Sequence, residues 1–154
     1  MKFSSLIAGV MNWGVWDKNL DTNTMEKLIH TFINQDITSF DHADIYGGYT
    51  TEESFGKAFK NSGIQRGNVQ FISKCGIKYL SKKRDYSIKH YDYSEEYILW
   101  SVEESLKNLQ NFFRNKVCQQ KNKQVGFAQL AYCQKTLEIE TEKNEQNESI
   151  FITH

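Results

Sequence analysis

The sequence lacks both proline and a net charge, and nothing in it accounts for the absence of proline. Its 19 lysines and arginines balance 19 aspartates and glutamates, so no general electrostatic field attracts the chain to nucleic acid or to an anionic membrane. A long hydrophobic run is missing as well. Asn12 and Asp17 interrupt the apolar stretch 6–11 before it reaches signal-peptide or transmembrane length. We therefore expect neither a nucleic acid nor a membrane as partner.

Cysteine and histidine are both sparse. The three cysteines, Cys75, Cys118 and Cys133, are an odd number without C-x-x-C spacing, which argues against a disulfide framework and against a structural zinc site. The four histidines form no H-x-H or H-x-x-x-H pair, so we expect no metal site. Free thiols favour a reducing compartment, and we predict a cytoplasmic protein.

The first 110 residues repeat one pattern within a chain whose 154 residues fit one domain. Three times, a short β-prone run is followed by polar or glycine-rich residues and then by a segment of helical period. This alternation predicts three βα units. The expected strands are 5–10, 37–43 and 68–75, and the expected helices carry 25–33, start at Thr50 with Glu53 in capping-box spacing, and run from near Ser94 to near Gln110.

The pattern stops after residue 110. The run QVGFAQLAYCQ fits either a strand or a short helix, TLEIETE alternates like an exposed strand, and KNEQNES is polar enough for a loop or a disordered segment. We therefore divide the chain into an N-terminal part, 1–110, and a divergent tail, 111–154, whose structure the sequence leaves uncertain. One alternative is that the tail supplies substitute strands to a small α/β sandwich.

Three reactive side chains fall where expected strands end. Asp41 and Tyr46 close the second strand, and Lys74 ends the third. The carboxyl ends of parallel strands face a shared mouth, so we expect the three groups to meet there. A cation beside a phenol lowers the pKa of that phenol. With Asp41 fixing the ammonium of Lys74, we expect Tyr46 to protonate a carbonyl oxygen as a hydride reaches the carbon.

Other polar and aromatic residues surround these positions. His42 and Asp44 alternate with them along the strand, so we expect both to serve packing or hydrogen bonding on its other side. Trp13 and Trp16 follow the first strand and are predicted either to pack as a lid or to form a wall of the substrate pocket. The basic run 82–84 is interpreted as a solvated loop.

The run FDHADIYGGYTTEESFGKAF resembles the signature of the aldo-keto reductase family, in which an Asp and a Tyr five positions apart precede a glycine and a Glu-rich helix start. The run ISK at 72–74 is similar to the lysine strand of that family. The segments SSLIAGVMNWGVWDKNLDTN, HYDYS and SVEESLKNLQ also resemble it, particularly its bacterial oxidoreductase branch. The resemblance covers residues 3 to about 110 in order and with normal spacing.

This resemblance implies an eight-stranded TIM-type βα barrel that reduces a small aldehyde or ketone with NADPH. The chain would form a partial barrel of about three βα units followed by the divergent tail. Asp41, Tyr46 and Lys74 carry over as catalytic residues, and Asp41 is also implied to contact the cofactor.

The sequence departs from the family after Gln110. The family's fourth catalytic residue, a histidine that ends the fourth strand, has no counterpart there, because Asn111 and FFRNKVCQQ follow. The terminal run SIFITH has the form of that strand and ends in His154, but it lies far beyond Gln110 and we interpret it as a chance match. The later segments that hold the cofactor phosphates are also missing, as is the second half of the barrel.

Two hypotheses follow from this departure. The chain is either a truncated NADPH-dependent reductase that is inactive alone, or a non-catalytic barrel remnant that acts as an interaction module. In the second case an exposed sheet edge would bind another copy or a partner chain. The sequence leaves open whether the chain is an enzyme.

Overall fold

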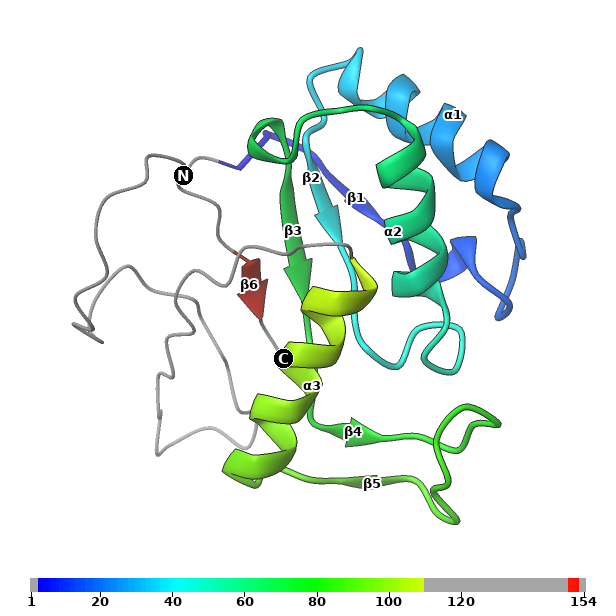
Figure 1. Cartoon of the computed structure of the whole chain (residues 1–154), viewed down its shortest axis with the longest axis vertical. Helices are drawn as coiled ribbons and strands as arrows, with labels where there is room; N and C mark the ends of the chain where they lie inside the picture. The colour runs from blue at the N-terminus through cyan, green and yellow to red at the C-terminus, as the bar shows by residue number, and fades with distance from the viewer. Residues whose placement is uncertain (1–2, 110–149, 153–154) are drawn as a thin grey trace, which may run out of the picture.

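The computed structural model describes residues 3–109 and the backbone of residues 150–152. Strands and helices alternate along the chain as predicted (Figure 1). The order is β1 (Ile7–Gly9), α1 (Thr22–Ile33), β2 (Ser39–Asp41), α2 (Thr51–Asn61), β3 (Gln70–Ser73) and α3 (Glu95–Asn108), with short 3-10 helices at Met11–Trp13 and Arg66–Asn68. Each strand is shorter than the β-prone run that contains it.

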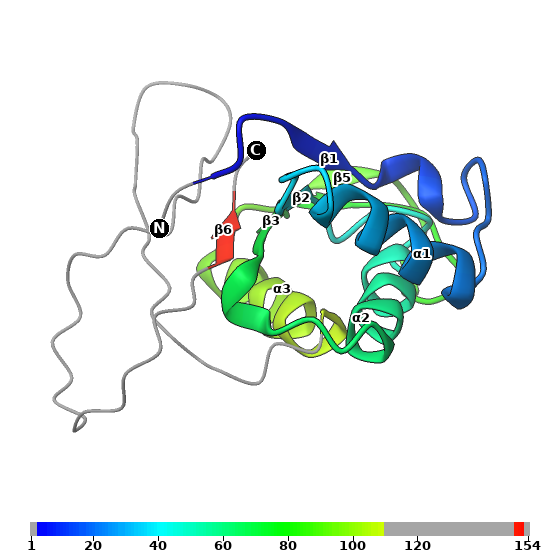
Figure 2. The same ribbon diagram turned by 90° about the horizontal axis from the view of Figure 1, so that it is seen from above.

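The described strands form a parallel sheet in the order β1-β2-β3-β6, where β6 is Ile150–Ile152. The register sets Phe40 of β2 opposite Phe71 of β3, and Phe71 opposite Ile150 of β6. The sheet is seen from above in Figure 2, where α1, α2 and α3 cover one of its faces. A parallel sheet with crossover helices on one face is the arrangement of a βα barrel opened along its length.

Strand β6 lies within the terminal run that has the form of a fourth strand. Residues Ile150–Ile152 pair in parallel with β3, on the edge where a fourth strand would lie. Hydrogen bonding to the free edge of β3 provides the physical reason, since a strand edge attracts any apolar β-prone segment. The interpretation of the final histidine as a chance match stays a prediction. His154 and the runs QVGFAQLAYCQ, TLEIETE and KNEQNES lie outside the described residues.

The core lies between the sheet and the helices and is rich in aromatic rings. Phe55 of α2 packs against Phe40 and Phe71, with ring centroids 5.2 and 5.4 Å apart. Because side chains alternate along a strand, Phe40 on the helix side leaves Asp41 on the opposite face of the sheet. Further core residues are Ala8, Val10, Trp13, Met25, Ile29, Ala58, Phe59, Val69 and Leu109. This packing fixes the face on which the reactive side chains emerge.

Two details of the helices differ from the sequence prediction or refine it. Thr50 is the N-cap of α2, but its hydroxyl donates to the Gly47 carbonyl oxygen at 2.7 Å instead of completing a capping box with Glu53. Glu53 instead pairs with Lys57, one turn later. Ser94 caps α3 as its position suggests, since its hydroxyl oxygen accepts from the Tyr97 amide at 3.3 Å.

The long segment between β3 and α3 contains an antiparallel pair that the sequence did not predict. Strands β4 (Ile77–Lys78) and β5 (His90–Tyr91) pair below the main sheet in Figure 1. Lys78 forms an ion pair of 2.5 Å with Asp92, which ties β4 to the chain leaving β5. The pair is only two residues long on each side, too short for alternation to be visible in the sequence.

Gly56 of α2 lies against the backbone at the end of α3. A Cβ added to Gly56 would lie 2.0 Å from the carbonyl oxygen of Asn108, a backbone atom that no rotamer change can move. We expect Gly56→Ala to force the helices apart and to lower the free energy of unfolding by about 1–3 kcal/mol in urea titrations. Gly9→Ala is the matched control, because a Cβ at Gly9 meets no atom within 4 Å. Equal stability of the two variants would contradict this packing.

Candidate active site

Backbone hydrogen bonds hold the carboxyl ends of β2 and β3 side by side at one edge of the sheet. Beyond the last paired residue of β2, the His42 amide still donates to the Ile72 carbonyl at 2.7 Å. The Asp44 amide then donates to the Lys74 carbonyl at 2.9 Å. The chain after β2 therefore continues along β3 before it turns away, and side chains from both segments face the same space.

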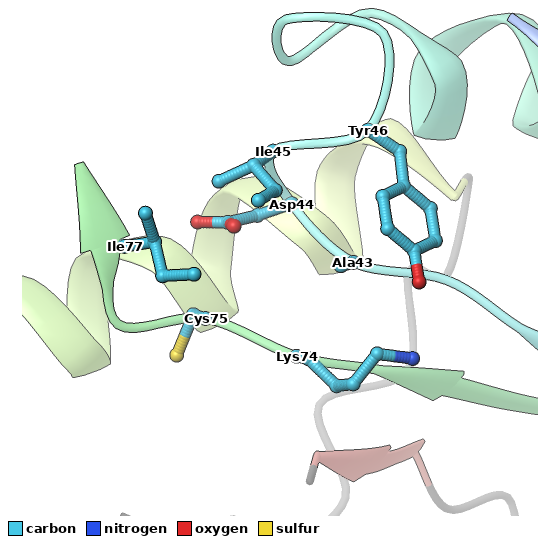
Figure 3. A pocket seen from close by; sticks show the side chains of 7 residues that line it. All are labelled: Ala43, Asp44, Ile45, Tyr46, Lys74, Cys75 and Ile77. Carbon is cyan, nitrogen blue, oxygen red and sulfur yellow. The ribbon is translucent and has the colours of Figure 1, made fainter. Parts of the chain in front are cut away.

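The three predicted site residues meet at this edge. Lys74 forms a charged hydrogen bond with Asp41, and their side chains are 21% and 32% exposed. The Lys74 ammonium lies 5.5 Å from the centroid of the Tyr46 ring. In Figure 3 the Tyr46 hydroxyl and the Lys74 amine point toward the same space. The acid, the amine and the phenol thus come together as the sequence predicted.

The protonation of Tyr46 differs from the sequence prediction. Partial burial raises the pKa of the Tyr46 phenol above its ordinary value of 10.0, and the negative charge of Asp41 raises it further. We expected the Lys74 cation to lower it. The ammonium of Lys74 is bound to the Asp41 carboxylate, and it does not offset the effect of burial on the phenol. Tyr46 is therefore a neutral phenol at neutral pH and keeps a proton to donate.

A turn with left-handed backbone follows Tyr46 and leads into α2. Gly47, Gly48 and Tyr49 have φ angles of 58°, 62° and 70°. A Cβ at Gly47 would also lie 2.5 Å from the hydroxyl oxygen of Thr51. Glycine reaches such angles without steric cost, so the Gly-Gly sequence lets the chain reverse directly after Tyr46 and keeps the phenol at the strand end.

A pocket of 190 Å³ is lined by two of the three groups, Tyr46 and Lys74. Its lining is largely apolar apart from Tyr46, Lys74 and Asp44, and the residues are Ala43, Asp44, Ile45, Tyr46, Lys74, Cys75 and Ile77 (Figure 3). Trp16 is 40% exposed and lies against Tyr46, with ring centroids 6.2 Å apart. Trp13 is buried on the helix side against Phe55 and Phe32. The structure thus favours packing for Trp13, whereas Trp16 remains a candidate pocket wall.

Polar residues behind the site are buried. His42 is fully buried against Phe55, with ring centroids 4.4 Å apart, and burial lowers its pKa to about 3, so the ring is neutral. Asp44 is also buried, and it accepts a hydrogen bond of 2.6 Å from Ser101. As the sequence predicted, His42 serves packing and Asp44 serves hydrogen bonding, although Asp44 also lines the pocket.

Glu52, in the first turn of α2, is the second buried carboxyl group. It accepts a hydrogen bond of 2.5 Å from the Ser73 hydroxyl, and burial raises its pKa from 4.5 to about 7. Between pH 4.5 and 7 the folded protein therefore binds more protons at Glu52 than the unfolded chain does. Rising pH lowers the stability that this residue contributes in that window.

We expect Glu52→Gln to remove this dependence. The difference in the free energy of unfolding, variant minus wild type, should increase by on the order of 3 kcal/mol as pH rises from 4.5 to 7. Glu53→Gln is the matched control, because hydrogen bonds from Lys57 and Lys83 lower the pKa of Glu53 to about 2. Its effect should change only below pH 4.5. If urea titrations gave parallel pH profiles of stability for Glu52→Gln and wild type, the raised pKa of Glu52 would be refuted.

The sequence interpretation missed the partners of these carboxyl groups. The interpretation of the basic run 82–84 as a solvated loop holds for Lys82 and Lys83, which are exposed, but not for Arg84. The Arg84 side chain is 10% exposed and pairs with Asp44 at 3.4 Å. Its neighbour Lys83 pairs with Glu53. Ser101 and Ser105 could have given a signal, because they lie four residues apart beside the apolar stripe of α3 and are both buried.

Two absences concern only the part of the chain that the structure describes. Within residues 3–109 and 150–152, no three side chains of His, Cys, Asp or Glu gather where they could hold a metal ion. No helix in the same residues is long and apolar enough to cross a membrane.

Fold and site together define a partial βα barrel with an acid–amine pair and a neutral phenol at the carboxyl ends of neighbouring strands. The sequence profile of the Aldo/keto reductase family matches residues 5–114. Since this match takes in more than half of the sequence, the chain belongs to the aldo/keto reductase family, which is a family of oxidoreductases. The resemblance drawn from the sequence is thereby confirmed.

Curated relatives match a similar share of the chain. The uncharacterized oxidoreductase YcsN of Bacillus subtilis is 43% identical over 110 residues, which are 71% of this chain and 36% of YcsN. The oxidoreductase YdhF of Escherichia coli is 35% identical over 108 residues, 70% of this chain and 35% of YdhF. The chain therefore spans about a third of the length of the curated relatives it matches.

The fold is shared with solved structures of the family. The aldo-keto reductase AKR11C1 of Bacillus halodurans, in its holo form, matches with a TM-score of 0.59 at 25% identity, over 73% of this chain and 34% of that one. The predicted partial TIM-type barrel is thus confirmed for the described residues.

Proposed function

We propose that this chain is an aldo-keto reductase-type oxidoreductase that reduces a small aldehyde or ketone with NADPH. The observation that carries the proposal is the convergence of the neutral Tyr46 phenol with the Asp41–Lys74 pair beside an apolar pocket. A carbonyl compound is the substrate that such a site suits, because reduction of a carbonyl group requires a proton at its oxygen.

Each of the three residues has a distinct role in the proposal. Tyr46 donates its phenolic proton to the carbonyl oxygen, which becomes the alcohol, while NADPH when bound supplies the hydride for the carbonyl carbon. Lys74 holds its positive charge beside Tyr46 and stabilises the phenolate left after the transfer. Asp41 keeps the Lys74 ammonium in place.

The described residues fit the nicotinamide end of the cofactor better than its phosphates. The pocket beside Tyr46 and Lys74 has an apolar lining suited to a flat ring. Two cations of the basic run, Lys83 and Arg84, are already paired with Glu53 and Asp44. We therefore propose that the chain by itself binds NADPH weakly and has weak activity. It spans about a third of the length of its curated relatives.

Titration of the full chain with NADPH, followed by fluorescence quenching, tests the proposal. Trp16 lies against Tyr46 and should report a nicotinamide ring in the pocket. Quenching that saturates, and that Trp16→Phe largely removes, would support cofactor binding at this site. A complete lack of binding would exclude autonomous reductase activity.

The exposed edge of β1 favours a second candidate function, that of a non-catalytic interaction module. Among the described strands, β1 pairs only with β2. Leu6 and Ile7 at this edge are 66% and 50% exposed, although apolar strand edges attract further strands. Binding of another copy or of a partner chain would cover them. A monodisperse monomer in size-exclusion chromatography with light scattering would count against self-association.

We also propose a cytoplasmic location, on the evidence of three cysteines without a disulfide pattern. Cys75, which the structure describes, is a free buried thiol.

A further inference from the structure

Asp44 lies two residues before Tyr46 and is fixed from outside its own loop. Its side chain is 1% exposed. The Ser101 hydroxyl of α3 donates to Oδ2 of Asp44 at 2.6 Å, across 57 positions of sequence. The Arg84 guanidinium pairs with the same oxygen at 3.4 Å. Two elements distant in sequence therefore hold one carboxylate.

Arg84 is itself held in place. Its guanidinium carbon lies 3.7 Å from the ring centroid of Tyr49 and 4.4 Å from that of Trp100. Such cation–π contacts fix both the position and the plane of the guanidinium. The support of Asp44 thus includes the turn after Tyr46, through Tyr49, and the helix α3, through Trp100.

Backbone hydrogen bonds connect Asp44 to the segments that carry the reactive groups. The Asp44 amide donates to the Lys74 carbonyl at 2.9 Å, and the Tyr46 amide donates to the Ala43 carbonyl at 3.1 Å. Movement of Asp44 would therefore shift Lys74 and Tyr46 relative to each other. The carboxylate itself does not reach the reactive atoms, since Figure 3 shows it turned away from the Tyr46 hydroxyl and the Lys74 amine.

Stability alone does not explain why a carboxylate is buried at this position. Transfer of a charge from water to a protein interior carries a penalty of several kcal/mol, and apolar residues of similar volume often stabilise a fold as well or better. Burial raises the pKa of Asp44 to about 6, so the group is still largely ionised at neutral pH. A directional restraint explains the use of a carboxylate here, because its bonds to Ser101 and Arg84 have defined geometry.

We propose that Asp44 is a positioning residue, which together with Ser101 and Arg84 sets the geometry between Tyr46 and Lys74. The inference rests on the proposed reductase function, because it concerns the same site. It goes beyond that function because it gives α3, through Ser101, and the loop between β4 and β5, through Arg84, a role in holding the reactive groups in place. Displacement of a reacting group by about 1 Å can lower turnover on the order of 10²-fold.

Asp44→Ala and Asp44→Asn test the proposal in two measurements. The first is the ring signal of Tyr46 in NMR spectra of chain labelled with [13C]-tyrosine, identified by its absence in Tyr46→Phe. This signal depends on the neighbouring Trp16 ring, 6.2 Å away, and so reports small shifts of Tyr46. The second is kcat and KM for reduction of 4-nitrobenzaldehyde with NADPH.

We expect Asp44→Ala to move the Tyr46 signal and to lower kcat on the order of 10²-fold with little change in KM. Asp44→Asn should keep the Tyr46 signal and kcat close to those of wild type, because the amide oxygen of asparagine can still accept a hydrogen bond from Ser101. Asp92→Ala is the matched control, since Asp92 is also an ion-paired aspartate but is bound to Lys78 outside the site. It should change neither measurement.

Ser101→Ala keeps the test decisive if Asp44→Ala does not fold. It removes the donor on α3 without altering the loop, and it should move the Tyr46 signal in the same direction by a smaller amount. An unchanged Tyr46 signal in a folded Asp44→Ala, or in Ser101→Ala, would overturn the proposal. If wild type shows no turnover but the signal moves as expected, the reductase function fails and the positioning role of Asp44 stands.

Discussion

Replacement of Tyr46 by phenylalanine is expected to lower carbonyl reduction by roughly 10²–10⁴-fold, the usual contribution of a positioned proton donor. The ring and its contact with Trp16 are retained in Tyr46→Phe, whereas the only transferable proton on that side chain is lost. NADPH affinity should be unchanged, because the substitution removes a single oxygen. The measurement is the rate of alcohol formation from 4-nitrobenzaldehyde at high NADPH concentration.

Tyr91→Phe is the control for this substitution. Tyr91 is 57% exposed on β5 and is not among the residues that line the pocket, so the same loss of a hydroxyl should leave the rate unchanged. Residual turnover of Tyr46→Phe close to that of wild type would show that another group protonates the carbonyl oxygen.

Phe55→Ala is expected to have the largest effect on stability, about 3–5 kcal/mol of unfolding free energy. Phe55 is fully buried, and its ring packs between Phe40 and Phe71 of the sheet, Trp13 of the first loop and the neutral ring of His42. Removal of the ring leaves a cavity that these four rigid neighbours cannot fill by collapse. Urea titration followed by circular dichroism measures the loss.

The matched control is Tyr91→Ala, which removes an aromatic ring of similar size from an exposed position. Its effect should be well below that of Phe55→Ala, because little apolar surface is returned to water. Similar destabilisation by the two substitutions would mean that the aromatic cluster around Phe55 is not the centre of the core.

Residues whose environment is local were predictable from the sequence. The strand that carries Phe40 and Asp41 alternates between an apolar and a polar side chain, and this alternation already separates the core face from the site face. The approach of Lys74 to Asp41 followed from the rule that parallel strands end at one edge. Neither inference needed the partner of any side chain to be known.

Features that depend on distant partners were not predictable. The pairing of Arg84 with Asp44 joins the loop between β4 and β5 to the end of β2, and no local pattern marks it. The direction of the Tyr46 pKa shift depends on the partial burial of the phenol and on the charge of Asp41. Only the structure shows that burial and the ion pair between Lys74 and Asp41. The run that contains β6 has the form of a fourth strand, but no local pattern shows that a segment so far along the chain pairs with β3.

The buried thiol of Cys75, at the back of the pocket, has a consequence for the chemical durability of the site. Burial raises the pKa of this thiol to about 12, so only a minute fraction is thiolate at neutral pH. Thiolate is the form that peroxides and alkylating agents attack, so the raised pKa slows the reaction of Cys75 with both. Cys75 lines the pocket but is only 5% exposed. Its rate of alkylation therefore measures how often local motion exposes the inner wall of the pocket.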